Sequence, residues 1–280
     1  MNKIALVLLI LLTVSLLSVS ILAFSPLFYK QPSKHGIAVI IIDGFSPDYF
    51  NYTPNLKGFK EASKSFTINT VNPPITPAAH ASIVSCQPPE INKITGYGAD
   101  FSGMPYLFAW SEKNNLHACS IYAKSSLGFL NKSYLFYYAP PNLQDADKLL
   151  AEKAKEYAET GCDIIIISLP ETDLIGHMHG PLSEQIKERL GALDMYWSGL
   201  INYFRLKNIR IIVTSDHGMC QEGPGGTHNT TKDCALKIPL IIDNNLTIPE
   251  KVYRNGIQLT DILPIICAYY GADCTEECYA

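Results

Sequence analysis

Three aspartates and three histidines stand at the ends of short apolar segments, in a pattern that could bind metal ions. Asp43 ends one isoleucine-rich run, and Asp216 and His217 follow another. Carboxylate and imidazole ligands together suit borderline divalent ions, zinc first and manganese or iron second. A catalytic zinc normally takes three protein ligands, so six candidates fit two ions about 4 Å apart, a spacing suited to in-line displacement at phosphorus. The candidate ligands are Asp43, Asp173, His177, Asp216, His217 and His228.

Each of these residues has an ordinary structural explanation when it is taken alone. An aspartate after a strand is often a turn or capping residue, and a lone histidine is usually a satisfied polar residue. The coincidence favours a site, because three of the seven histidines lie beside aspartates or in a glycine-rich loop. Asp173 also precedes His177 by one helical turn, so both face the same way. We interpret His80 as helix packing near the site and His179 as a neighbour of the ligands.

Thr76 precedes Pro77, which suits the first position of a helix because proline lacks an N–H there. The simplest interpretation is that the Thr76 hydroxyl caps this helix. Next to a divalent ion, however, the hydroxyl could ionise and attack phosphorus, and the helix amides could receive phosphate oxygens. Thr76 is therefore a candidate nucleophile.

The elements that must position these residues alternate between strands and helices. Nearly continuous Ile/Val runs are typical of strands buried on both faces of a parallel sheet. The pattern predicts strands at Gly36–Ile42, Ala118–Ala123, Asp163–Ser168, Ile209–Thr214 and Ile238–Ile242. It predicts helices at Asn55–Ser63, Pro77–Cys86, Asp145–Thr160, Leu182–Phe204 and Gln258–Tyr270. This order indicates an α/β fold, a doubly wound and mostly parallel sheet between helices, with one domain over residues 36–280. The candidate ligands fall at the carboxyl ends of strands, where such sheets bind ligands.

Composition excludes several classes of protein. The chain has 280 residues and a net charge of -4, and 17% of its residues are charged. That length can bury a full hydrophobic core, and the low charge argues against intrinsic disorder. A slightly acidic chain lacks the basic face of a protein that binds nucleic-acid duplexes.

The segment Ile4–Phe24 is a run of 21 residues without charge or proline, long enough to span a bilayer as a helix. We expect residues 1–25 to be a membrane anchor, with the catalytic domain outside the cytoplasm. A cleaved signal peptide, which would make the protein secreted, is the alternative, and a buried core helix is a third possibility.

Eight cysteines, all beyond Ile4–Phe24, are consistent with an oxidising compartment. We expect disulfides near Cys220 and Cys234 and among the three cysteines at 267–278. The remaining three are predicted to be inert core thiols: Cys86, Cys119 and Cys162. The absence of a C-x-x-C pair argues against a zinc finger.

Several segments in order resemble the alkaline phosphatase superfamily, and most closely its type I phosphodiesterase/nucleotide pyrophosphatase branch. The matching segments are Ile41–Gly44, Thr53–Leu56, Thr76–His80, Asp173–Pro181, Ser215–Met219, Gly226–His228 and Asp261–Pro264. The resemblance implies one zinc held by Asp173, His177 and His228, and a second held by Asp43, Asp216 and His217. It also implies that Thr76 forms a phospho-threonine intermediate. The sulfatase branch is disfavoured, because Thr76-Pro77-Ala78 lacks its Cys/Ser-x-Pro-x-Arg motif.

The chain departs from this branch in two ways. An asparagine that contacts the phosphoryl group in the branch is replaced, without a gap, by Tyr97, which could donate a hydrogen bond in its place. The chain is also short for the superfamily, so insertions that build substrate pockets are largely missing. Lys124, at the end of a predicted strand, could contact phosphate, or it could be a solvated surface lysine.

Together these features predict a two-zinc hydrolase of phosphoric esters, with phosphodiester or nucleotide pyrophosphate bonds as leading substrates. The same site could serve a phosphomonoesterase, a phosphonate hydrolase or a phosphoethanolamine-type transferase acting on a phospholipid or glycan headgroup. A non-catalytic, metal-containing cell-surface binding protein is the alternative of another class.

Overall fold

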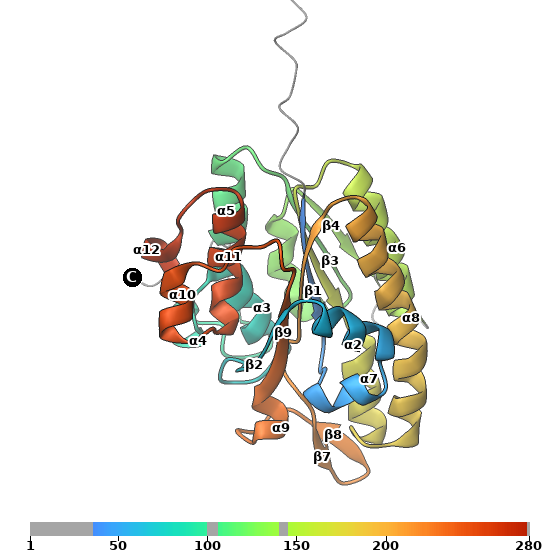
Figure 1. The fold of residues 1–280 in the computed structure, drawn as a ribbon. Coiled ribbons are helices and arrows are strands. Elements are labelled where there is room, and N and C mark those ends of the chain that lie inside the picture. The colour runs from blue at the N-terminus through green and yellow to red at the C-terminus, as the bar shows by residue number, and fades with distance from the viewer. Residues whose placement is uncertain (1–35, 100–105, 140–144, 279–280) are drawn as a thin grey trace, which may run out of the picture. The chain divides into compact units, whose positions relative to one another are not determined.

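A seven-stranded sheet forms the centre of the computed structural model, which describes residues 36–99, 106–139 and 145–278 (Figure 1). The strand order is β2-β9-β6-β1-β5-β3-β4. Strands β4, β3, β5, β1 and β6 pair in parallel, whereas β9 runs antiparallel to both β6 and β2. Their bounds are β1 Ile37–Ile42, β2 Lys64–Asn69, β3 Ala118–Tyr122, β4 Leu135–Tyr138, β5 Ile164–Leu169, β6 Arg210–Thr214 and β9 Lys237–Ile242.

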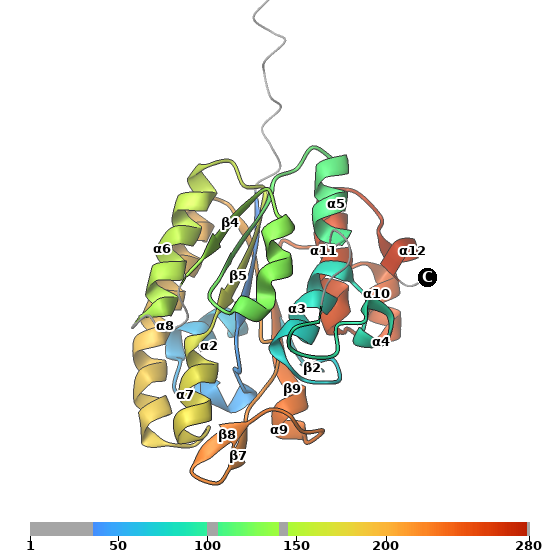
Figure 2. The same ribbon diagram turned by 180° about the vertical axis from the view of Figure 1, so that it is seen from behind.

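Helices cover both faces of the sheet, because its central strands are apolar on both sides (Figures 1 and 2). Odd-numbered residues of β1 pack into the core on one face and even-numbered residues into the core on the other. The first face carries α3 (Thr76–Ser85), α5 (Tyr106–Lys113), the 3-10 helix η3 (Ser125–Lys132) and α11 (Ile262–Tyr269). The second carries η2 (Pro47–Asn51), α2 (Pro54–Glu61), α6 (Ala146–Glu159) and α8 (Glu184–Leu206).

Shorter elements surround the carboxyl edge of the sheet and the end of the chain. Helix α7 (Glu171–His179) follows β5, and a small antiparallel hairpin of β7 (Cys220–Glu222) and β8 (Gly225–Thr227) follows β6. The others are α4 (Pro89–Asn92), α9 (Asp233–Leu236), α10 (Glu250–Asn255), η4 (Leu259–Asp261) and α12 (Thr275–Cys278).

The predicted mixed α/β fold, with a mostly parallel sheet flanked by helices, is confirmed. All five predicted strands are present within two residues of their expected bounds, but the last of them, β9, is antiparallel. The sequence pattern did not predict β2, β4, the β7–β8 hairpin or α5. Strands β2 and β4 lie at the two edges of the sheet, where the alternation of exposed and half-buried residues gives a weaker apolar signal than a buried Ile/Val run.

Four disulfides join all eight cysteines: Cys86–Cys278, Cys119–Cys162, Cys220–Cys234 and Cys267–Cys274. The prediction of inert thiols at Cys86, Cys119 and Cys162 is wrong. Cys119 lies on β3 and Cys162 immediately precedes β5, so the pairing of these neighbouring strands brings their Cα atoms to 5.9 Å. Apolar surroundings did not distinguish a free thiol from a bonded one.

The predicted segment Ile4–Phe24 lies outside the residues that the structure describes. Within the described residues, none of the helices combines the length and the apolar character needed to cross a membrane.

Candidate active site

The carboxyl ends of two adjacent strands bring together the first cluster of candidate ligands. Asp43 follows β1, and Asp216 and His217 follow β6, which pairs with β1 in parallel. All three residues are fully buried, and one ligand atom from each lies within 4.8 Å of the others. This is the set that the resemblance assigned to one ion.

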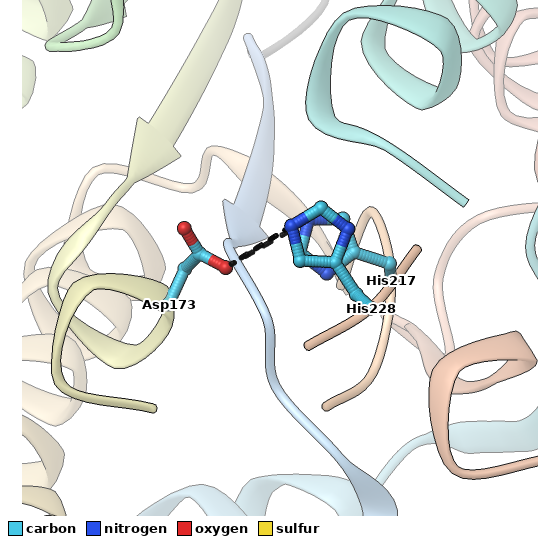
Figure 3. Close-up of side chains that lie close together, drawn as sticks. All are labelled: Asp173, His217 and His228. Atoms are coloured by element: carbon cyan, nitrogen blue, oxygen red, sulfur yellow. Dashed lines mark ion pairs between the residues drawn. The ribbon is translucent and has the colours of Figure 1, made fainter. Parts of the chain in front are cut away.

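The second cluster joins α7 to the loop after β8 (Figure 3). It comprises Asp173, His217 and His228, again with ligand atoms within 4.8 Å of one another. The imidazoles of His217 and His228 are stacked, with centroids 3.6 Å apart, and Nε2 of His228 lies 3.7 Å from Oδ1 of Asp173. His217 therefore belongs to both clusters.

His177 lies at the margin of the second cluster. Its Nε2 is 3.3 Å from Oδ1 of Asp173, one helical turn earlier, and its side chain is 43% exposed. The resemblance implies that His177 is the third ligand beside Asp173 and His228. In the cluster that the structure shows, the third residue is His217. The structure thus brings all six candidate ligands to one edge of the sheet, with His177 the most exposed of the histidines among them.

At two positions the backbone approaches α7 so closely that only glycine fits. Gly44 has a φ of +72°, and a Cβ there would lie 3.0 Å from Cα of Asp173. A Cβ on Gly225 of β8 would lie 2.2 Å from the carbonyl oxygen of His177. The turn after β1 and the β7–β8 hairpin can therefore approach α7 only without side chains at these positions.

The imidazoles present the nitrogen that a metal needs. Nδ1 of His177, His217 and His228 lies 2.9, 3.0 and 2.7 Å from the backbone carbonyls of Gly226, Gly218 and Pro74, respectively. A carbonyl only accepts, so each Nδ1 carries a proton, and in the neutral form of each ring Nε2 keeps its lone pair. The contact with Asp173 raises the pKa of His177. A backbone carbonyl on the second nitrogen is the usual support of a metal-bound histidine.

The carboxylates also have free acceptor positions. Oδ1 of Asp43, Oδ1 of Asp173 and Oδ2 of Asp216 are buried and accept no hydrogen bond. Unpaired buried carboxylate oxygens are costly unless something compensates them. Burial lowers the pKa of His217 and, together with His217, lowers that of His228 to about 4, so both are neutral near pH 7. Neutral imidazoles and unpaired carboxylate oxygens are the donor set that borderline divalent cations prefer, so these residues fit metal ions.

Lys124 takes part in the site and is not a solvated surface residue, since only 17% of its side chain is exposed. Its Nζ lies 2.6 Å from Oδ2 of Asp43, 2.6 Å from Oδ2 of Asp173 and 3.2 Å from Oγ1 of Thr76. Burial alone would lower the pKa of Lys124, but attraction to the aspartates raises it above its usual value. Burial would likewise raise the pKa of Asp173, but Lys124 and His177 bring it well below its usual range. Lys124 is therefore a fixed cation that touches one residue of each cluster.

Thr76 is the first residue of α3, and its side chain faces the clusters. The helix has Ile75 at its N-cap position and no side-chain cap, so the capping interpretation of Thr76 is wrong. Oγ1 of Thr76 lies 3.4 Å from Nε2 of His217. Tyr97 is 60% exposed, and the Thr76 side chain is near enough to lower the pKa of its hydroxyl, although burial raises that pKa overall. Both predicted substrate contacts, Tyr97 and Lys124, thus meet at Thr76.

His80 packs one turn after Thr76, as expected, whereas His179 is exposed at the end of α7. Nδ1 of His80 donates to the carbonyl of Thr76 at 2.9 Å, and the side chain is completely buried. Burial lowers the pKa of His80 to about 3.

This buried histidine should make the metal-free protein less stable in acid. The unfolded chain protonates His80 near its ordinary pKa of 6.5, whereas the folded protein resists protonation until about pH 3. The unfolded state binds more protons between these values, so stability is full above pH 6.5 and falls as the pH drops. We expect the free energy of unfolding to fall from pH 7 to pH 5 by about 2 kcal/mol more in wild type than in His80→Gln. Urea unfolding in EDTA measures this, and identical pH profiles would refute it.

Asp147 and Glu171, which are buried beside Asp173, were not predicted from the sequence. An acidic residue in the first turn of a helix carries no signal of its own, because that position is favourable for any carboxylate. Only the contact between two helices distant in sequence reveals them.

An α/β sandwich with two Asp/His clusters at its carboxyl edge, beside a threonine at a helix start, is the arrangement that the resemblance to the alkaline phosphatase superfamily implies. The sequence matches the type I phosphodiesterase / nucleotide pyrophosphatase family over residues 37–118 and 131–231, and the chain belongs to that family.

Solved structures share the fold. An inactive murine ectonucleotide pyrophosphatase / phosphodiesterase 5 in complex with AMP is 21% identical, with a TM-score of 0.58, over 68% of this chain and 58% of that chain. The lipoteichoic acid synthase LtaP from Listeria monocytogenes is 13% identical, with a TM-score of 0.62, over 86% and 72%. The C-terminal periplasmic domain of EptC from Escherichia coli is 13% identical, with a TM-score of 0.61, over 86% and 84%.

A curated relative is 2,3-bisphosphoglycerate-independent phosphoglycerate mutase from Rhodopirellula baltica, 29% identical over 136 residues. The aligned part is 46% of this chain and 24% of the mutase. The chain thus spans about a quarter of that relative's length.

Proposed function

We propose that this protein is a two-metal hydrolase of phosphoric esters in which Thr76 is the nucleophile. The observation that carries the proposal is that Oγ1 of Thr76 lies against His217, the residue common to both Asp/His clusters. Membership of a family of phosphodiesterases and pyrophosphatases supports phosphoester chemistry.

Two divalent ions, zinc first, are the proposed cofactors. Asp43, Asp216 and His217 would hold one, and Asp173 and His228 would hold the other together with His177, which the family resemblance favours. Bound there, the ions would supply Lewis-acid stabilisation of the negative charge that develops on the nucleophile and the transferred group.

The residues themselves account for orientation and charge. Thr76 stands at the start of α3, where backbone amides can receive phosphoryl oxygens. Attack of Oγ1 would form a bond to phosphorus as the bond to one ester oxygen breaks, and the proton lost by Thr76 would leave with the released alcohol. The rest of the ester would stay on Thr76 as a phospho-threonine, which water then hydrolyses. Lys124 donates toward Oγ1 at 3.2 Å, so its charge stabilises the ionised hydroxyl, and it is also within reach of a phosphoryl oxygen bound there. Tyr97 would offer a second hydrogen bond to the same group.

We propose phosphodiesters or nucleotide pyrophosphates as substrates, and phosphomonoesters, phosphonates or a phosphoethanolamine-type transfer to a lipid or glycan headgroup as alternatives. The similarity of the fold to phosphonoacetate hydrolase from Sinorhizobium meliloti supports keeping the phosphonate alternative. The four disulfides support a catalytic domain outside the cytoplasm, over residues 36–280, either anchored by residues 1–25 or secreted. A metal-containing binding protein remains the alternative of another class.

Turnover by the purified chain tests this proposal. We expect hydrolysis of bis(p-nitrophenyl) phosphate, loss of activity after chelation, recovery with zinc, and two ions per chain by elemental analysis. Rates on p-nitrophenyl phosphate, and rates with an added alcohol acceptor, distinguish the monoesterase and the transferase. A chain that binds fewer than two ions and turns over none of these substrates would support the binding protein.

A further inference from the structure

Helices α6 and α7 begin side by side and cap each other. Oδ1 of Asp147, in the first turn of α6, accepts a hydrogen bond from the backbone N–H of Glu171 at 3.1 Å. Oε1 of Glu171, the first residue of α7, accepts one from the backbone N–H of Asp147 at 2.9 Å. Neither helix has a cap from its own N-cap side chain. Each helix therefore depends on the other for the pairing of its first amides.

Helix α8 donates a hydrogen bond to each of these two carboxylates. Nε1 of Trp197 donates to Oδ2 of Asp147 at 2.9 Å, and Nε of Arg189 donates to Oε2 of Glu171 at 2.8 Å. All four carboxylate oxygens thus have a donor. Asp147 is completely buried and Glu171 is 7% exposed. Burial of Asp147 and Glu171 near Arg189 contributes little to stability, because the cost of desolvating the charges offsets much of their attraction to the arginine. The arrangement instead restricts where α7 can begin.

The start of α7 determines the position of Asp173. Asp173 is two residues after Glu171, in the same first turn, and Gly44 lies so close that a Cβ on it would be 3.0 Å from Cα of Asp173. Its Oδ1 accepts no hydrogen bond and is the atom that faces the imidazoles of His177 and His228. Two features therefore restrict the turn that carries this oxygen: the close approach of Gly44 and the Asp147 cap on Glu171.

We infer that Asp147 is a positioning residue that holds Asp173 in the second Asp/His cluster and so sets the metal affinity of that cluster alone. The inference rests on the proposed two-metal site. Asp43 and Asp216, the two ligands that belong to the first cluster alone, follow β1 and β6, although the clusters share His217. Among the described residues no hydrogen bond or ion pair joins Asp43 or Asp216 to Asp147 or Glu171, so the ion of the second cluster should respond more strongly.

Zinc titration against a chromophoric chelator tests the inference through binding. We expect Asp147→Ala to weaken one of the two ions by about ten- to a hundred-fold, as loss of a supporting contact typically does, and to leave the other within about threefold. Asp147→Asn keeps one acceptor oxygen at this position, so it should fold more readily than Asp147→Ala. It should weaken binding of the same zinc ion by a smaller factor. The weakened ion should be the one that Asp173→Ala loses and Asp43→Ala retains.

Asp194→Asn is the matched control. Asp194 is also a buried carboxylate, on α8, and it caps α2 by accepting from the backbone N–H groups of Asn55 and Leu56 at 2.9 and 2.8 Å. Helix α2 carries no candidate ligand, so this variant should lose thermal stability without changing either zinc affinity. Equal weakening of both ions by Asp147→Asn, or the same effect in Asp194→Asn, would overturn the inference. A wild type that binds no zinc would instead contradict the proposed function.

Discussion

Replacement of Thr76 by alanine should abolish phosphoester hydrolysis and leave metal binding intact. The side chain is buried at the start of α3, and its Oγ1 lies 3.4 Å from Nε2 of His217 and 3.2 Å from Nζ of Lys124. Alanine removes the only atom of residue 76 that can bond to phosphorus. We expect kcat for bis(p-nitrophenyl) phosphate to fall by about 10⁴-fold or more, since loss of a covalent nucleophile leaves only binding and electrostatic stabilisation.

Three measurements make this prediction specific to the nucleophile. Zinc content should stay at two ions per chain, because Thr76 belongs to neither Asp/His cluster. Thr76→Ser keeps the hydroxyl and should retain measurable turnover. Wild type quenched in acid during turnover of bis(p-nitrophenyl) phosphate should carry a p-nitrophenyl phosphoryl group on Thr76 by mass spectrometry, and Thr76→Ala should not. Full activity of Thr76→Ala with both ions bound would mean that another group attacks phosphorus.

The convergence of the candidate metal ligands at one edge could be predicted because these residues obey simple local rules. Asp43 and Asp216 directly follow isoleucine-rich strands, and the ends of neighbouring parallel strands meet at one edge. The sequence did not indicate how the candidate ligands are divided between the two clusters. His217 stacks on His228 only because the loop after β8 folds back to Pro74, a contact between residues 154 positions apart.

Burial of charged groups was the least predictable feature of the site. A lysine at the end of a strand is usually solvated, and nothing local to Lys124 indicates two carboxylates within 2.6 Å. Asp147 and Glu171 are likewise paired across 24 positions. Periodicity describes which face of an element is apolar, and it carries no information about which ionisable groups of distant elements meet in the core.

Lys124 follows β3 and lies outside the two segments that match the family. The family match therefore says nothing about this lysine, and its role has to be inferred from its contacts. Among the described residues, it is the one lysine that reaches both clusters and the proposed nucleophile, Thr76. A phosphoryl group on Thr76 would place its oxygens beside this ammonium group. Because attraction grows with charge, a phosphomonoester dianion should gain more from Lys124 than a phosphodiester monoanion.

We therefore expect Lys124→Met to lower kcat/KM for p-nitrophenyl phosphate by about 10²- to 10³-fold, the usual cost of losing one donor to a developing oxyanion. The loss for bis(p-nitrophenyl) phosphate should be smaller, and inhibition by inorganic phosphate should weaken in parallel. Lys124→Arg keeps the charge and should recover part of the difference. Zinc content should not fall, because removing a cation from between Asp43 and Asp173 leaves more negative charge for the ions.

Lys132→Met, at the exposed end of η3, is the control for loss of a lysine on the same side of the fold and should match wild type on both substrates. If Lys124→Met loses zinc, then Lys124 holds the carboxylates in place, and the substrate contact is not its main role. If both substrates lose the same factor with zinc retained, then Lys124 acts on the Thr76 hydroxyl, whose ionisation is common to both reactions. Only a larger loss on the dianion, with both ions bound, assigns Lys124 to the phosphoryl group.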